Sequence, residues 1–125
     1  MSAESRQDAW SWWSARRRRY NVVLALAGGA ACLLYLVALA VRCADVPGVE
    51  VTLFTTAFQG VGYLIAMGVA NLCYNLGPAL EPRLGRRDVA AYRRAAFRAG
   101  LWFSAGLPFV IPALVFALGC QPEPP

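Results

Sequence analysis

Three long runs of residues without a charged side chain constrain this chain more than any other feature. They cover residues 21–41, about 51–76 and about 100–119, and apolar side chains dominate each of them. A helix over the first run would be about 31 Å long at ~1.5 Å per residue, which matches a bilayer core of about 30 Å. The sequence therefore predicts an all-α membrane protein with three transmembrane helices.

The N-terminal residues 1–20 predict a basic and aromatic arm at the membrane interface. Ser5 precedes Asp8 by three positions, a weak capping-box pattern that favours a short separate helix. Indole and phenol rings prefer the headgroup layer, and here Trp10, Trp12, Trp13 and Tyr20 surround four arginines. We expect this interfacial helix to precede a single transmembrane domain over residues 21–125. The alternative is a docking arm for an acidic partner, although a basic run alone is weak evidence for nucleic acid.

The connection between the second and third runs predicts an amphipathic basic extension on the cytoplasmic side. Gly77-Pro78 is expected to end the second helix, since glycine suits the position after a helix and proline cannot continue it. Asp88 can cap a new helix that leads into the third run. Pro108 and Pro112 lie inside that run and predict a kink.

A cleaved signal peptide is the alternative interpretation of the first run. Arg17-Arg18-Arg19-Tyr20 has some likeness to a twin-arginine signal, and Ala38-Leu39-Ala40 has the form of a cleavage site. The run is longer than the ~7–15 residues of a signal's apolar region. We therefore expect the first helix to be retained.

Arginine supplies all 12 basic residues, and its distribution predicts the orientation of the chain. Residues 1–20 and the second connection hold all of them except Arg42. The positive-inside rule then places the N-terminus in the cytoplasm and the C-terminus in the periplasm of a bacterial inner membrane. Richness in alanine, arginine and glycine suggests the bacterial source. The basic residues expected at the interface, where anionic phospholipid is the predicted partner, are Arg16, Arg17, Arg18, Arg19, Arg86, Arg87, Arg93 and Arg94.

Two cysteines are expected at the outer face in this orientation. Cys43 follows the first run and Cys120 follows the third, so adjacent packing of these helices would let them form a disulfide in the periplasm. The alternative is that both stay unpaired, because membrane helices also use cysteine as a small apolar residue.

The second run carries a stripe of polar and small residues at helical spacing. Such residues let helix backbones approach closely and let side-chain amides bond across helices, so we expect this helix to be the centre of the packing. The residues predicted to form a helix-packing or oligomer interface are Thr55, Gln59, Gly62, Ala66, Ala70, Asn71 and Asn75.

The functional class expected from these features is non-catalytic. The chain has no histidine or lysine, no paired cysteine motif and no nucleophile motif, so we expect no enzyme, metal or cofactor. We expect a small inner-membrane protein that works by helix–helix contact, as a homo-oligomer or as an accessory subunit of a larger membrane protein. The alternative is an oligomeric pore-forming or membrane-perturbing effector. The absence of charged residues inside the runs argues against ion-coupled transport.

Overall fold

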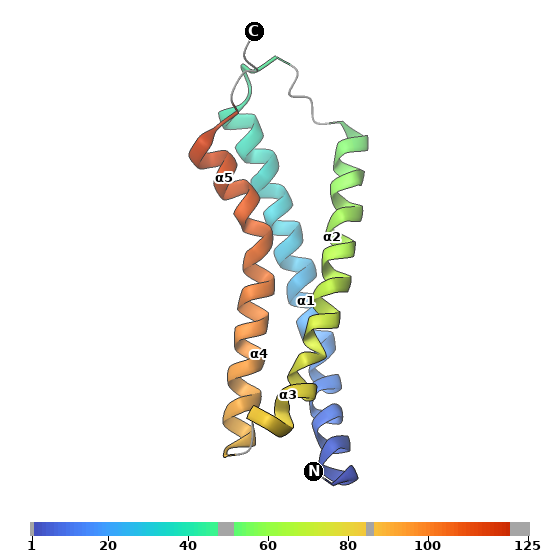
Figure 1. Cartoon of the computed structure of the whole chain (residues 1–125). Helices are drawn as coiled ribbons and strands as arrows, with labels where there is room; N and C mark the ends of the chain where they lie inside the picture. Colours follow the sequence, from blue (N-terminus) through green and yellow to red (C-terminus); the bar gives the residue numbers. More distant parts are fainter. Residues whose placement is uncertain (1, 48–51, 85–86, 121–125) are drawn as a thin grey trace.

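The computed structural model describes residues 2–47, 52–84 and 87–120, and these residues form helices and turns with no strand. Three long helical arms stand side by side and are joined at alternate ends (Figure 1). Their elements are α1 (Ala3–Arg42), α2 (Leu53–Tyr74), α3 (Leu76–Leu84), α4 (Val89–Gly106), the 3₁₀ turn η1 (Leu107–Phe109) and α5 (Val110–Leu118).

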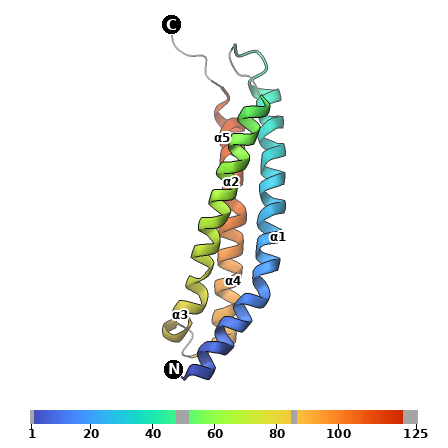
Figure 2. The same ribbon diagram turned by 90° about the vertical axis from the view of Figure 1, so that its right-hand side faces the viewer.

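Each of the three arms is long and apolar enough to cross a membrane, as the sequence predicted. The spans lie within Ala3–Arg42, Leu53–Leu84 and Val89–Leu118, and every arm is longer than the ~20 residues that a bilayer requires. In all three arms, the part that exceeds a bilayer span lies at the same end of the bundle. The N-terminus, α3 and the start of α4 meet at this end (Figures 1 and 2). That end also carries the described arginines other than Arg42.

The predicted separation of a short N-terminal helix from the first span is wrong. Residues 3–42 form one helix of 40 residues, about 60 Å long at ~1.5 Å per residue. Ser2 caps it by accepting a hydrogen bond from the Ser5 backbone N–H at 3.2 Å. No proline or glycine lies between Ala3 and Leu24, so nothing in the backbone interrupts the helix where the sequence changes from charged to apolar.

The centre of the packing is α1, although the sequence led us to expect this of the second span. Its buried residues recur at spacings of four and seven, which places them on one stripe of the helix. The small residues Ala31 and Ala38 on this stripe let α5 approach closely, while Trp13 and Tyr20 fill the wider space at the other end. The buried residues are Ala9, Trp13, Tyr20, Leu24, Ala31 and Ala38.

The second arm breaks at Asn75 and not at Gly77-Pro78, which corrects the predicted helix end. Pro78 has no N–H to donate to the Tyr74 carbonyl, and its ring opposes a regular helix at that carbonyl. The chain turns at Asn75 and resumes at once as α3, where Pro78 is the third residue and the missing donor costs little. As a result, α3 turns across the bundle toward α4 (Figure 1).

The third arm changes helix type at Pro108, the first of the two prolines at which the sequence predicted a kink. Gly106 ends α4, Pro108 lies in the 3₁₀ turn η1, and α5 resumes at Val110. Pro112 is buried against α1. The arm therefore remains one continuous path across the apolar region with a local change of helix type.

Candidate functional site

A buried carboxylate organises the arginine-rich end of the bundle. Glu81, on α3, is 4% exposed and accepts three hydrogen bonds from the Arg93 guanidinium at 2.7–3.1 Å. The Trp13 indole N–H donates to the same carboxylate at 3.0 Å. Arg93 also pairs with Asp8 at 2.9 Å, although the Asp8 side chain is 70% exposed. These residues come from three helices, α1, α3 and α4. We name them the Glu81 cluster: Asp8, Trp13, Glu81 and Arg93.

Aromatic rings enclose the Glu81 cluster on the side facing the apolar region. Trp13 meets Tyr74 edge to face with ring centroids 5.4 Å apart, and the Tyr74 hydroxyl donates to the Trp13 carbonyl at 2.8 Å. Trp12 meets Phe97 at 6.4 Å and lies under the Arg16 guanidinium at 3.7 Å. Edge-to-face pairs and cation–π contacts stabilise such an arrangement beyond the apolar area that they bury. The same contacts fix the rotamers that hold Glu81 against Arg93.

The electrostatics of this end favour a charged Arg93 and a neutral Tyr92. The hydrogen bonds to Glu81 raise the pKa of Arg93, and Asp8 adds to the effect, so the guanidinium stays charged. Burial raises the pKa of Tyr92, and the Glu81 carboxylate raises it further. The neutral phenol donates a hydrogen bond to the Gly77 carbonyl at 3.0 Å, which ties α4 to the start of α3.

Polar contacts join α1 to the C-terminal half of α2. The Asn71 amide donates to the Asn21 side chain at 2.6 Å, and the Arg17 guanidinium donates to Asn75. Tyr63 donates to the Leu24 carbonyl from above Gly28, where only a glycine leaves room for its ring. Thus Asn71 and Asn75, which the sequence placed at an interface, both contact α1. Ala70 packs against the buried group of Trp13, Tyr20, Leu24 and Tyr74.

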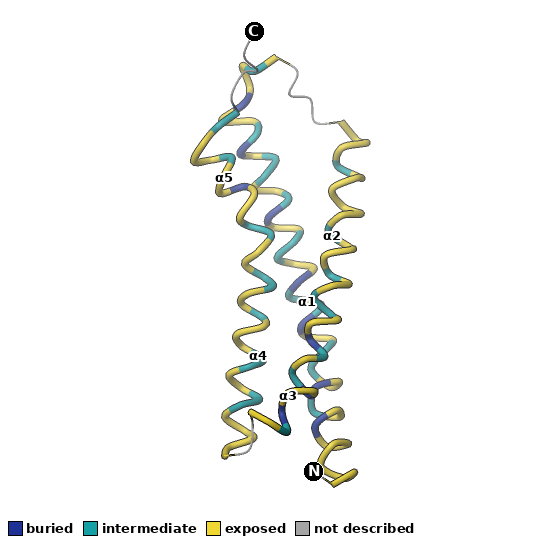
Figure 3. Tube along the Cα trace, viewed as in Figure 1, coloured by how far each residue is buried: buried dark blue, intermediate teal, exposed yellow. Residues whose placement is uncertain are grey.

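The other predicted interface residues of α2 lie on its exposed side. Thr55, Gln59, Gly62 and Ala66 contribute little or nothing to the described packing, and a Cβ added at Gly62 would meet no atom within 4 Å. The first half of α2 stands away from α1 and is exposed on nearly all sides (Figures 1 and 3). We name Thr55, Gln59, Gly62 and Ala66 the outer stripe of α2.

The predicted interface arginines divide into engaged and exposed groups. Arg16, Arg17 and Arg93 bind aromatic or polar partners within the chain. The exposed members are Arg18, Arg19, Arg87 and Arg94, and Arg86 lies outside the described residues. An exposed arginine at this end can bind a phosphate, whereas Arg93 would first have to break its ion pairs with Asp8 and Glu81.

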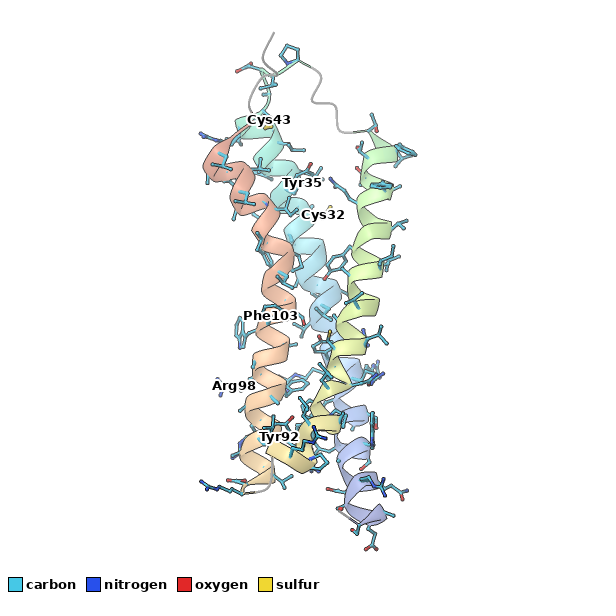
Figure 4. All side chains as sticks on the ribbon, viewed as in Figure 1. Cys32, Tyr35, Cys43, Tyr92, Arg98 and Phe103 are labelled. Carbon is cyan, nitrogen blue, oxygen red and sulfur yellow. A yellow bond between two sulfur atoms is a disulfide. The ribbon has the colours of Figure 1, made fainter. Side chains whose placement is uncertain are left out.

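At the opposite end, a disulfide joins α1 to the end of the third arm. Cys43 is buried, and its Cα lies 5.3 Å from that of Cys120, the pair that the sequence suggested. Figure 4 shows Cys43 where α1 and α5 both end. Cys32 and Cys73 are free thiols. The bond closes a chain segment that includes all of α2, α3 and α4.

A groove of about 340 Å³ lies just inside the arginine-rich end. Trp13 and Tyr20 form its floor, α2 and α3 form one wall, and α4 forms the other. The polar groups that reach it include the Tyr20 and Ser104 hydroxyls, which are 2.7 Å apart and bonded to each other. The wall residues are Cys73, Tyr74, Leu76, Gly77, Leu80 and Leu84 on one side and Tyr92, Ala96, Phe97, Gly100, Phe103 and Ser104 on the other.

The sequence did not identify Glu81, Trp13 or Tyr74 as partners, nor the groove between the arms. One signal was present, because Glu81 is an isolated acid within an arginine-rich connection, between two prolines.

Within the described residues, no group of three histidine, cysteine, aspartate or glutamate side chains is placed to bind a metal ion. Comparison with known protein families, curated proteins and solved structures finds no match to this chain.

Proposed function

We propose that this chain is a small, non-catalytic protein of a bacterial inner membrane that works by helix–helix contact through the outer stripe of α2. It would do so as a homo-oligomer or as an accessory subunit of a larger membrane complex. The observation that carries the proposal is the exposure of Gln59 on a helix long and apolar enough to span a bilayer.

The unpaired amide of Gln59 is costly for a helix surrounded only by lipid. Its side chain makes no hydrogen bond to another described residue, and leaving a polar group unpaired in hydrocarbon costs several kcal/mol. A partner helix can supply both a hydrogen bond and close backbone contact over Gly62 and Ala66. Interhelical hydrogen bonds of this kind contribute about 0.6–2 kcal/mol, which is enough to select a packing face.

Two features at opposite ends support a cytoplasmic N-terminus and a periplasmic C-terminus. The arginines gather at the end of the bundle that holds the N-terminus, in agreement with the positive-inside rule. The Cys43–Cys120 bond lies at the other end, and the periplasm is the compartment where disulfides form. The exposed arginines would then contact the anionic phospholipid of the cytoplasmic leaflet.

Affinity purification from the source cells tests the proposal. The full chain is extracted in mild detergent after crosslinking, and co-purifying chains are identified by mass spectrometry. We expect a stoichiometric partner or a defined homo-oligomer that is lost in Gly62→Leu and retained in Leu64→Ala. A monomer without a partner in both variants and in the parent chain would contradict the proposal.

The second candidate function is an oligomeric pore, and the hydroxyl groups near the outer end of α2 favour it. Hydrogen bonds join the Thr52 and Thr55 hydroxyls, and the Thr55 and Thr56 hydroxyls donate to the Thr52 carbonyl. Together with Gln59, these side chains could form the polar wall of a pore. A pore would depolarise cells on induced expression, and Gln59→Leu would prevent it. Unchanged membrane potential on expression would exclude this second function and leave the first intact.

A further inference from the structure

We propose that the groove between α2–α3 and α4 binds one anionic phospholipid from the leaflet that faces the arginine-rich end. One acyl chain would lie in the groove, and the phosphate would lie at Arg83 and Arg87. This inference rests on the proposed function, because it requires that the chain spans a bilayer.

The shape and lining of the groove fit an acyl chain. Its volume of about 340 Å³ is at the lower end of the range for small-molecule sites, and its walls are mainly aliphatic and aromatic. The Tyr20 and Ser104 hydroxyls satisfy each other, so the floor offers no strong unpaired polar group to a water-soluble ligand. Leu76, Leu80 and Leu84 lie along one side of α3 at spacings of four and are all exposed, which extends the apolar wall outward.

The position of the groove connects it with the hydrocarbon region. Gly100, Phe103 and Ser104 belong to the third apolar run, whereas Leu84 and Tyr92 lie toward the arginine-rich end. A groove that crosses this boundary can hold a tail in its apolar part and leave a headgroup at the boundary. Because the groove is lined by two separate arms, a lipid can enter between them without unfolding any helix.

Charge complementarity selects an anionic lipid as the occupant. Arg83 directly precedes Leu84, the last lining residue of α3, and Arg87 precedes α4; both arginines are exposed, and neither forms an ion pair with a described residue. An arginine near an anionic membrane surface contributes about 1 kcal/mol. Figure 4 places Tyr92 on the α3 side of α4 and Arg98 on the opposite side, so Arg98 serves as a matched control.

Two glycines of α4 provide a clean test of the tail site. Gly100 lines the groove and Gly106 does not, and a Cβ at either would meet no atom within 4 Å. Gly100→Leu should therefore fill the groove without disturbing the fold, and Gly106→Leu adds the same side chain elsewhere on the same helix. The full chain is reconstituted in nanodiscs of mixed phosphatidylglycerol and phosphatidylcholine, released, and examined by native mass spectrometry for retained lipid.

We expect one retained phosphatidylglycerol on the parent chain and on Gly106→Leu. Gly100→Leu should retain about tenfold less, which corresponds to ~1.4 kcal/mol of binding free energy. The Arg83→Gln/Arg87→Gln variant should lose the preference for phosphatidylglycerol, and Arg6→Gln/Arg98→Gln, which removes two exposed arginines away from the groove, should keep it. Equal retention by both leucine variants, or no preference for the anionic lipid in the parent chain, would overturn the inference.

Two further readouts separate lipid binding in the groove from membrane integration and from self-association. Resistance to alkaline extraction measures membrane integration alone, so an integrated chain that retains no lipid contradicts the lipid site but not the proposed function. Cys73 lines the groove, and in a Cys32→Ala background it is the remaining free thiol. Its oxidation to a Cys73–Cys73 dimer in the bilayer would place a second copy in the groove and exclude the lipid.

Discussion

At the residue scale, the chain holds its arginine-rich end together with one buried acid. The Glu81 carboxylate accepts hydrogen bonds from both Arg93 and Trp13, and each of these partners comes from a different helix. Two charges removed from water are stable together only when good hydrogen bonds join them, and here the Nε and Nη2 groups of Arg93 both donate to Glu81. The exposed Asp8 adds a weaker contact to Arg93, because solvent screens an ion pair in which one partner is 70% exposed.

Removal of the Glu81 carboxylate should therefore destabilise the protein far more than removal of the Asp8 charge. Glu81→Ala leaves Arg93 buried without its main partner and should cost about 3 kcal/mol of unfolding free energy. Asp8→Asn should cost about 0.5 kcal/mol or less. Thermal unfolding in mild detergent, followed by circular dichroism, measures both, and similar losses in the two variants would contradict the central role of Glu81.

At the element scale, the arms differ in how firmly they are held. The pairing of α1 with α4–α5 extends along most of α1, whereas α2 contacts α1 mainly from Tyr63 onward. At this contact, Gly28 lies directly under the Tyr63 ring. The fit at this one residue therefore controls how closely α2 approaches α1.

Two adjacent glycines allow this contact to be tested. A Cβ at Gly28 would lie 2.1 Å from Tyr63 Cε1, so Gly28→Ala must displace the ring and lose its bond to Leu24, at a cost of about 1–3 kcal/mol. Gly29→Ala meets nothing within 4 Å and should stabilise α1 by about 0.5–1 kcal/mol. Unfolding midpoints of the two variants should therefore move in opposite directions. A shift of the same sign in both would show that Tyr63 does not pack on Gly28.

The sequence predicted the elements better than the contacts, for identifiable physical reasons. Uninterrupted apolar runs and the prolines at 108 and 112 act locally, so three spans and the change at η1 could be read directly. The continuity of α1 was missed because the side chains change from charged to apolar at Tyr20. The preference of the backbone for helix continues through this point. The Trp13–Glu81 bond joins residues 68 positions apart, and no local pattern encodes such a pairing.

At the scale of the whole molecule, the two ends are fastened by different chemistry. Ion pairs and aromatic contacts hold the arginine-rich end, whereas the Cys43–Cys120 bond holds the other. Only the disulfide depends on the redox compartment, so the arginine-rich end can form its contacts under reducing as well as oxidising conditions. The disulfide then prevents the end of α5 from separating from the end of α1.

Loss of the disulfide should destabilise the bundle without altering its spans. It joins residues 77 positions apart, and a loop of that size corresponds to about 4 kcal/mol in the chain-entropy model. Cys43→Ser/Cys120→Ser should therefore unfold at a lower temperature, and Cys32→Ser should unfold close to the parent chain. Alkylation without reduction should modify Cys32 and Cys73 only. Modification of all four cysteines in the native protein would contradict the pairing.

The orientation of the chain determines whether this bond can form at all, which makes topology and redox state one joint prediction. With the arginine-rich end in the cytoplasm, Cys43 and Cys120 face the periplasm, and a tag placed after Pro125 should be removed by protease added to spheroplasts. An N-terminal tag should be protected in the same cells. In cells that lack the periplasmic thiol-oxidising system, the same chain should keep its orientation and accumulate with four reactive thiols. A protected C-terminal tag together with a formed disulfide would contradict the orientation, because the reducing cytoplasm would not sustain that bond.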